Sequence, residues 1–200
     1  MKRSTKMDWR VLYDPFTALG NGRGLAMAVL AVVVLGAVAR WGGVHVGEAL
    51  VPKADPSPFP VRTVLIDSLV GWISLAVLLF VASRVMRGGG GFGAYLAVSG
   101  LSRFPYMIAV IILSRPVLGD AMMKAMYPPG EGVIIRPDQI ITPGLAVGML
   151  AVCAMMAWTI VVLYHGFKAS SRLPGNKAVL GFLIGAVAAQ LLGWLLLRGI

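Results

Sequence analysis

Three groups of residues in this 200-residue chain have types and spacings that could do chemistry. Residues 88–93 carry the pattern G-x-G-x-x-G, which cradles a nucleotide phosphate when it follows a strand and opens a helix. Arg103 stands inside an apolar stretch, where a cation is typical of a transport path or an ion site. Ser99 and His165 are the residue types of a nucleophile and a base, as in an intramembrane serine protease. The elements that position these residues decide between these chemistries.

The composition indicates that lipid surrounds much of the chain. It is 58% hydrophobic and 13% charged, whereas about 25% of the residues of a water-soluble domain are charged. A helix needs about 20 mostly apolar residues to cross a bilayer. Lipid cannot form hydrogen bonds with backbone N–H and C=O groups, and a helix pairs these groups with one another. We therefore expect an all-α polytopic membrane protein with five transmembrane helices. The predicted spans are residues 24–40, 64–86, 94–114, 143–165 and 178–197.

The basic residues predict how these spans are oriented. Five spans place the two termini on opposite sides, with ten Lys and Arg residues on the side of the N-terminus and seven on the other. Lys and Arg are enriched on the cytosolic side, so the N-terminus is predicted to be cytosolic. The net charge of +10 then reflects topology and attraction to anionic lipid headgroups. We expect no nucleic-acid partner, because no aromatic and basic module accompanies the charge.

The predicted domain division is a cytosolic lead-in, residues 1–23, and a five-helix membrane domain, residues 24–200. Four large apolar side chains of the lead-in share one helical face, surrounded by basic residues, which predicts a helix on the membrane surface. They are Trp9, Leu12, Tyr13 and Phe16. An ordered segment that packs on the bundle is the alternative, and the two are compatible.

The context of the glycine run argues against a nucleotide site. It follows a membrane helix rather than a strand, and no Lys-Ser or Lys-Thr pair follows it. The better interpretation is a tight cytosolic hairpin between the second and third spans, where glycine permits a positive φ and a close approach of the helices. The hairpin glycines are Gly88, Gly89, Gly90, Gly91 and Gly93.

Polar residues of the third span form one stripe with Arg103 beside it. The stripe consists of Tyr95, Ser99, Ser102 and Tyr106. A charge at mid-membrane is costly, so Arg103 should face the bundle interior, with Gln190 at a similar depth and Asp67 within reach. Pro105 should kink the helix there. This polar centre is either functional, such as part of a transport path, or a structural tie between helices.

Small residues predict close helix packing, within the bundle or between copies of the chain. They are Gly144, Gly148, Gly181, Gly185, Ala189 and Gly193. Catalytic patterns are absent from the sequence otherwise, with no H-E-x-x-H motif, no metal cluster and no G-x-S-x-G. The Ser99 hydroxyl is expected to bond its own helix backbone. We therefore expect no enzyme, no cofactor and no metal.

Three segments together resemble the Yip-domain family of five-span membrane proteins, which interact with Ypt/Rab GTPases. They are "VLYDPFTALGNGRG" before the first span, "RGGGGFGAYLAVSGLSRFP" entering the third, and "LYHGFKASSRLPGNKAVLGFLIG" between the last two. The short lead-in resembles the prokaryotic branch, which implies a cytoplasmic (inner) membrane, or an endomembrane in a eukaryotic cell. The lead-in and Arg103 depart from the eukaryotic pattern that binds Rab proteins.

The resemblance implies a non-enzymatic membrane adaptor or scaffold with a trafficking-like role. Its expected partners are the lipid bilayer, a protein on the cytosolic face or in the membrane, and a second copy of the chain. The alternative is a transporter, or the membrane subunit of a transport complex, with its polar centre at Arg103.

Overall fold

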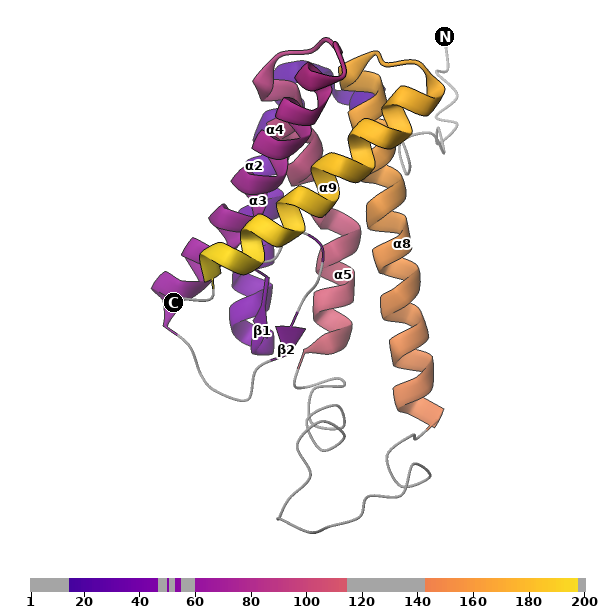
Figure 1. Cartoon of the computed structure of the whole chain (residues 1–200). Helices are drawn as coiled ribbons and strands as arrows, with labels where there is room; N and C mark the ends of the chain where they lie inside the picture. The colour runs from indigo at the N-terminus through magenta and orange to yellow at the C-terminus, as the bar shows by residue number, and fades with distance from the viewer. Residues whose placement is uncertain (1–14, 47–49, 51–52, 55–59, 115–142, 198–200) are drawn as a thin grey trace, which may run out of the picture.

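The computed structural model describes residues 15–46, 50, 53–54, 60–114 and 143–197. Six helices and one pair of short strands make up this part of the chain (Figure 1). In chain order they are α2 (Pro15–Gly42), β1 (Val44–His45), β2 (Lys53–Ala54), α3 (Val61–Val85), α4 (Phe92–Leu101), α5 (Arg103–Leu113), α8 (Pro143–Ser171) and α9 (Gly175–Leu197).

Five helical segments of the described chain are long and apolar enough to cross a membrane, with α4 and α5 forming one of them. The shortest, Arg23–Gly42, has 20 residues, which at 1.5 Å per residue is about 30 Å. The prediction of an all-α polytopic membrane protein is confirmed. The helices are longer than the predicted spans: α2 begins at Pro15 and α8 continues to Ser171. Apolar composition marks only the part of a helix that lies in hydrocarbon, and a helix can continue into the interface.

Two of the three most extensive helix contacts join helices that are not neighbours in the described chain. The most extensive contacts are those of α3 with α9, α2 with α4, and α5 with α8. Figure 1 shows α9 crossing the bundle obliquely, whereas α5 and α8 stand side by side. The connection from α3 to α4 and the connection from α8 to α9 lie together at one end of the bundle (Figure 1). A backbone hydrogen bond joins the two connections.

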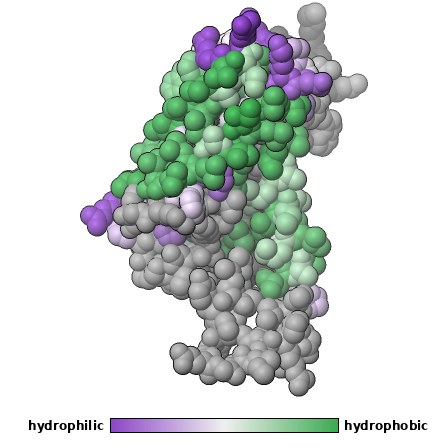
Figure 2. All heavy atoms as spheres, viewed as in Figure 1, coloured by the Kyte–Doolittle hydropathy of each residue, from purple (hydrophilic) through white to green (hydrophobic). Residues whose placement is uncertain are grey.

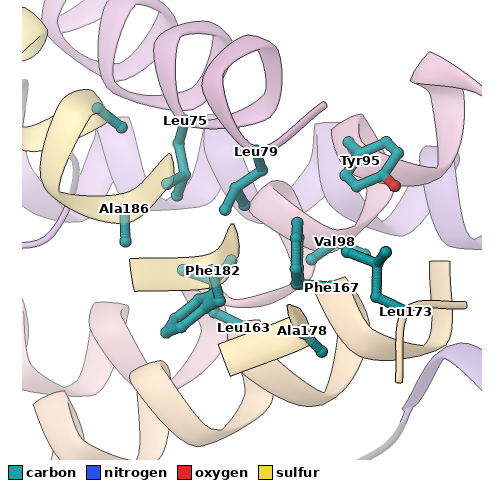
Figure 3. Packing of buried hydrophobic residues seen from close by; sticks show 11 residues of the cluster. Leu75, Leu79, Tyr95, Val98, Leu163, Phe167, Leu173, Ala178, Phe182 and Ala186 are labelled. Atoms are coloured by element: carbon teal, nitrogen blue, oxygen red, sulfur yellow. The ribbon is translucent and has the colours of Figure 1, made fainter. Parts of the chain in front are cut away.

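Two buried apolar clusters hold the bundle together. The first joins α3, α4, α8 and α9 around Leu79, Val98, Phe167 and Phe182 (Figure 3). The second joins α2, α3, α5 and α8 with the segment at β1, and includes Tyr106. Outside these clusters the helices carry exposed apolar side chains, and green surface covers the visible face of α9 and much of α8 (Figure 2). Such a continuous apolar surface fits contact with lipid.

The third span is interrupted at Ser102, between α4 and α5. Proline has no backbone N–H, so Pro105 cannot bond the carbonyl oxygen of Leu101 four residues earlier. Pro105 lies in the first turn of α5, and the break between the two helices falls at Ser102, three residues before the proline.

A short antiparallel strand pair lies between α2 and α3 in the chain. Val44 pairs with Ala54, and His45 pairs with Lys53. Two-residue strands leave no hydropathy pattern in the sequence, so this pair was not predicted.

Candidate functional site

The glycine hairpin begins with a well-formed helix end at the last turn of α3. The N–H of Gly88 donates to the Ser83 carbonyl oxygen at 2.7 Å, and the N–H of Arg87 donates to the Arg84 carbonyl oxygen at 3.0 Å. These two bonds are those of a Schellman motif, in which the residue after the cap takes a left-handed conformation. That residue here is Arg87, with φ 62°. The chain direction is therefore fixed by hydrogen bonds before the glycine run starts.

The hairpin packs against the turn between α8 and α9. The N–H of Gly89 donates to the carbonyl oxygen of Ser171 at 2.8 Å. Gly90 has φ +85°, and a Cβ at this position would lie 2.5 Å from the Ser170 carbonyl oxygen. A side chain at residue 90 is thus excluded both by the backbone conformation and by the neighbouring turn. The hairpin is a fixed contact between two connections rather than a loose joint.

Tyr95 supports the hairpin from inside the bundle. Its hydroxyl group donates to the Gly89 carbonyl oxygen at 2.9 Å and lies 2.7 Å from the Ser83 Oγ atom. Its ring is fully buried and meets the rings of Phe80 and Phe167 edge-on, with centroids 5.6 and 6.1 Å away. Figure 3 shows Tyr95 at the edge of the first cluster, to which Phe167 also belongs. The position of the hairpin is thereby tied to the packing of α3, α4 and α8.

Exposed cations gather on these two connections, where Figure 2 shows purple surface at the end of the bundle. We call this surface the basic platform and define it as Arg84, Arg87, Lys168, Arg172 and Lys177. Arg84 is held in place, since its guanidinium group donates to the Gly90 carbonyl oxygen at 3.0 Å and lies 5.0 Å from the centroid of the Phe80 ring. Asp67, the acidic residue within the described ranges, lies near the opposite end of α3.

Two arginines of the basic platform adopt left-handed backbone conformations. Arg87 has φ 62° and Arg172 has φ 54°. A left-handed conformation costs a residue with a Cβ about 1–2 kcal/mol, and glycine usually takes such positions. Arg172 follows α8 directly, and Arg87 follows the C-cap of α3, Met86. A Cβ at Gly89 would lie 3.9 Å from the Arg172 Cδ atom. The fold thus maintains two strained cations on adjoining turns, a feature that is often associated with function.

The predicted polar centre lies in the interior of the bundle. Arg103 is only 2% exposed, and its guanidinium carbon lies 5.1 Å from the centroid of the Tyr106 ring. The Ser102 hydroxyl donates to the Ser99 carbonyl oxygen at 2.9 Å, and the Ser99 hydroxyl donates to the Leu96 carbonyl oxygen at 3.2 Å. Both hydroxyl groups therefore bond their own helix. A buried guanidinium over an aromatic face is stabilised by a cation–π contact.

Two further residues of the predicted polar centre contact the segment between α2 and α3. The Gln190 Oε1 atom accepts a hydrogen bond from the Leu50 N–H at 2.9 Å. Asp67 is 3% exposed, and its Oδ2 atom lies 2.7 Å from the His45 Nδ1 atom. The sequence placed Asp67 within reach of Arg103, and the pairing with His45 was not foreseen because it needs the chain to turn back after β1.

Gly185 of α9 packs against α3, and Gly181 lies between the C-cap of α3 and α8. A Cβ at Gly185 would lie 3.0 Å from Leu79 and 3.2 Å from Ala82, while one at Gly181 would lie 3.3 Å from Met86. The same stripe continues through two buried positions, Ala189 and Gly193. The stripe of α8 differs, because a Cβ at Gly144 would meet no atom within 4 Å, and Gly148 is half-buried. For Gly144, a contact with a second copy of the chain remains a prediction.

A close approach of α2 and α4 involves a glycine that the spacing argument missed. A Cβ at Gly100 would lie 2.3 Å from the Ala28 Cβ atom and 2.8 Å from its Cα atom, so α2 and α4 touch backbone to backbone there. The small-residue pair Ala97 and Gly100 on the third span could have predicted this contact. The longer stripe of small residues on the fifth span was considered instead.

Most of the predicted interfacial helix lies outside the described residues. Trp9, Leu12 and Tyr13 of the predicted interfacial helix lie outside the described residues, and Phe16 falls within the first turn of α2. Within the described ranges, no three His, Cys, Asp or Glu side chains are grouped so that they could hold a metal ion.

Comparison with known proteins identifies the family of the chain. Neither a search of curated proteins nor a search of solved structures found a match. A family model, described as Yip1 domain, matches residues 9–197, which include all five apolar helices and both connections of the basic platform. The chain is therefore an integral membrane protein that belongs to the Yip1 domain family.

Proposed function

We propose that this Yip1-domain protein is a non-enzymatic membrane adaptor that presents the basic platform to an acidic surface of a protein partner in the cytosol. The proposal includes the predicted orientation, with the N-terminus and both connections of the basic platform on the cytosolic side of a cytoplasmic membrane or endomembrane. A role in membrane organisation or trafficking follows from recruiting such a partner.

The observation that carries the proposal is the hydrogen-bonded backbone of the two connections that bear the basic platform. A bond of 2.8 Å joins the Gly89 N–H to the Ser171 carbonyl oxygen, and Arg84 is fixed on the Gly90 carbonyl oxygen. Charges that serve only to orient a membrane helix need no fixed positions. Cations that project from a fixed backbone need less ordering when a partner binds, which favours recognition of a defined acidic surface.

The hydroxyl and imidazole geometry gives an enzyme little support. The Ser99 hydroxyl donates to a backbone carbonyl oxygen of its own helix, and the His165 ring contacts the Tyr164 ring with centroids 5.8 Å apart. A nucleophile and its base would have to bond each other. A serine that bonds its own helix is the common structural arrangement.

A transport function is the second candidate, and the burial of Arg103 favours it. Intramembrane charges are often functional. At 2% exposure, however, Arg103 offers a solute little surface in this conformation. A transporter predicts that Arg103→Gln abolishes uptake of a solute by proteoliposomes, whereas an adaptor predicts that the variant still recruits its partner.

The experiment is purification of the full chain in mild detergent, comparing the wild type with a double variant, Lys168→Glu with Arg172→Glu. The control reverses an exposed charge at the other end of α3, Arg62→Glu. We expect a partner with the wild type and with the control, its loss from the Lys168 and Arg172 variant, and release of the partner by salt.

Two results would overturn the proposal. One is recovery of the same partner from all three proteins, because the basic platform would then play no part in recruitment. The other is recovery of an ATPase together with loss of solute uptake in the Arg103→Gln variant, which would establish the transport alternative.

A further inference from the structure

A cavity opens between α2 and α3 at the end of the bundle opposite the basic platform. Its volume is about 460 Å³, within the range of small-molecule sites. The walls are almost entirely apolar, and they include residues that are exposed on the outside of the bundle, such as Val33, Leu65 and Leu69. The cavity thus opens sideways, towards the position of the bilayer lipids.

Two polar groups stand at defined depths in this apolar cavity. Arg40, in the last turn of α2, lines its outer end. Ser68 lines its inner part, is 5% exposed, and has no hydrogen-bond partner for its Oγ atom among the described residues. A serine in an apolar helix ordinarily bonds the carbonyl oxygen one turn earlier. A buried hydroxyl without a partner is costly, so this one is expected to bond something that occupies the cavity.

The missing side chain of Gly36 makes room beside this hydroxyl. A Cβ at Gly36 would lie 3.3 Å from the Ser68 Oγ atom and 3.7 Å from Val64. Gly36 precedes Arg40 by one helical turn, about 6 Å along the axis. Ser68 is therefore roughly one turn closer to the middle of the membrane than Arg40, and the apolar walls continue inward past it to Val32 and Leu69.

We propose that this cavity binds one anionic phospholipid. The phosphate group lies at the Arg40 guanidinium, an ester carbonyl oxygen accepts a hydrogen bond from the Ser68 hydroxyl, and an acyl chain follows the apolar walls inward. The order of chemistry along the cavity, a cation, then a hydroxyl donor, then apolar surface, matches the order of groups in a phospholipid. The alternative occupant is a transmembrane helix of another chain, which is about 10–12 Å across with its side chains. Its side chains could enter the cavity, but it carries no phosphate group for Arg40.

The test is native mass spectrometry of the full chain released from mild detergent with phosphatidylglycerol or phosphatidylcholine added. We expect one molecule of phosphatidylglycerol retained by the wild type, with weaker retention of phosphatidylcholine. Arg40→Gln should weaken phosphatidylglycerol binding roughly tenfold and remove the preference between the lipids. Ser68→Ala should weaken both lipids about twofold to tenfold, the loss of one hydrogen bond. Gly36→Leu should fill the cavity and abolish the retained lipid.

Matched controls lie on the same helix. Arg62→Gln removes an exposed arginine that does not line the cavity, and Ser74→Ala removes a buried serine outside it, so both should bind lipid as the wild type does. Equal retention of the two lipids by the wild type would overturn the proposal, and so would equal losses in Arg62→Gln and Arg40→Gln. Disulfide capture between two chains through Ala37→Cys, in a Cys153→Ser background, would overturn it in favour of a second copy as the occupant. If Gly36→Leu does not fold, the other variants still decide.

Discussion

Replacing Gly90 by alanine tests whether the glycine hairpin is a fixed contact. Gly90 has φ +85°, and a Cβ there would lie 2.5 Å from the Ser170 carbonyl oxygen and 3.3 Å from its carbonyl carbon. The left-handed conformation costs alanine about 1–2 kcal/mol. Forcing a methyl group into filled space adds about 1–3 kcal/mol. Gly90→Ala should therefore lower the free energy of unfolding by about 2–5 kcal/mol.

Gly93→Ala is the matched control, three residues further along the chain. Gly93 lies in α4, where a Cβ would meet no atom within 4 Å. Alanine is favoured over glycine in the middle of a helix by about 0.5–1 kcal/mol, and by less in the first turn, so this variant should be at least as stable as the wild type. The assay is unfolding by sodium dodecyl sulfate in mixed micelles, followed by tryptophan fluorescence. Similar stabilities of the two variants would refute the packed hairpin.

The remaining predictions concern single groups of the same structure and use the same unfolding assay. Arg87→Gly should raise the free energy of unfolding by about 0.5–1 kcal/mol, because glycine adopts the left-handed conformation without strain. The same variant should weaken partner recruitment, because it removes a charge of the basic platform. A loss of stability would contradict the Schellman motif at the end of α3. Tyr95→Phe removes the hydroxyl that bonds the hairpin and should cost about 1–3 kcal/mol, and an unchanged stability would show that the hairpin does not need this bond. A double-mutant cycle on His45→Ala and Asp67→Asn should give a coupling energy of about 1–3 kcal/mol, whereas additive effects would mean that the 2.7 Å contact contributes nothing.

The five spans could be predicted because each exceeds the length and apolar content that a bilayer demands. That signal is local, as in the 25 residues of α3, and needs no knowledge of neighbouring helices. It underestimates helix length where polar residues continue the helix, as at residues 15–23 before the first span and 166–171 after the fourth. Backbone hydrogen bonds continue the helix in these segments, and the hydropathy of the side chains does not indicate them.

The geometry of the candidate sites could not be predicted in the same way, because it depends on contacts between distant segments. The sequence indicated a tight hairpin at Gly88–Gly93, but not that Gly89 bonds Ser171, more than 80 residues away. It indicated a buried arginine, Arg103, with Asp67 within reach. In the structure Asp67 pairs with His45. Pairings of this kind follow from which helices pack together, and α3 packs most extensively on α9 rather than on its neighbours in the chain.

The most direct test of the account is the sidedness of the basic platform. In a Cys153→Ser background, Arg87→Cys and Arg62→Cys place single thiols at the two ends of α3, both at exposed positions. A membrane-impermeant maleimide is added to intact cells and then to permeabilised cells. The account predicts that the thiol at residue 62 is labelled in intact cells and the thiol at residue 87 only after permeabilisation. Labelling of residue 87 in intact cells would place the basic platform outside the cytosol and contradict the proposed adaptor.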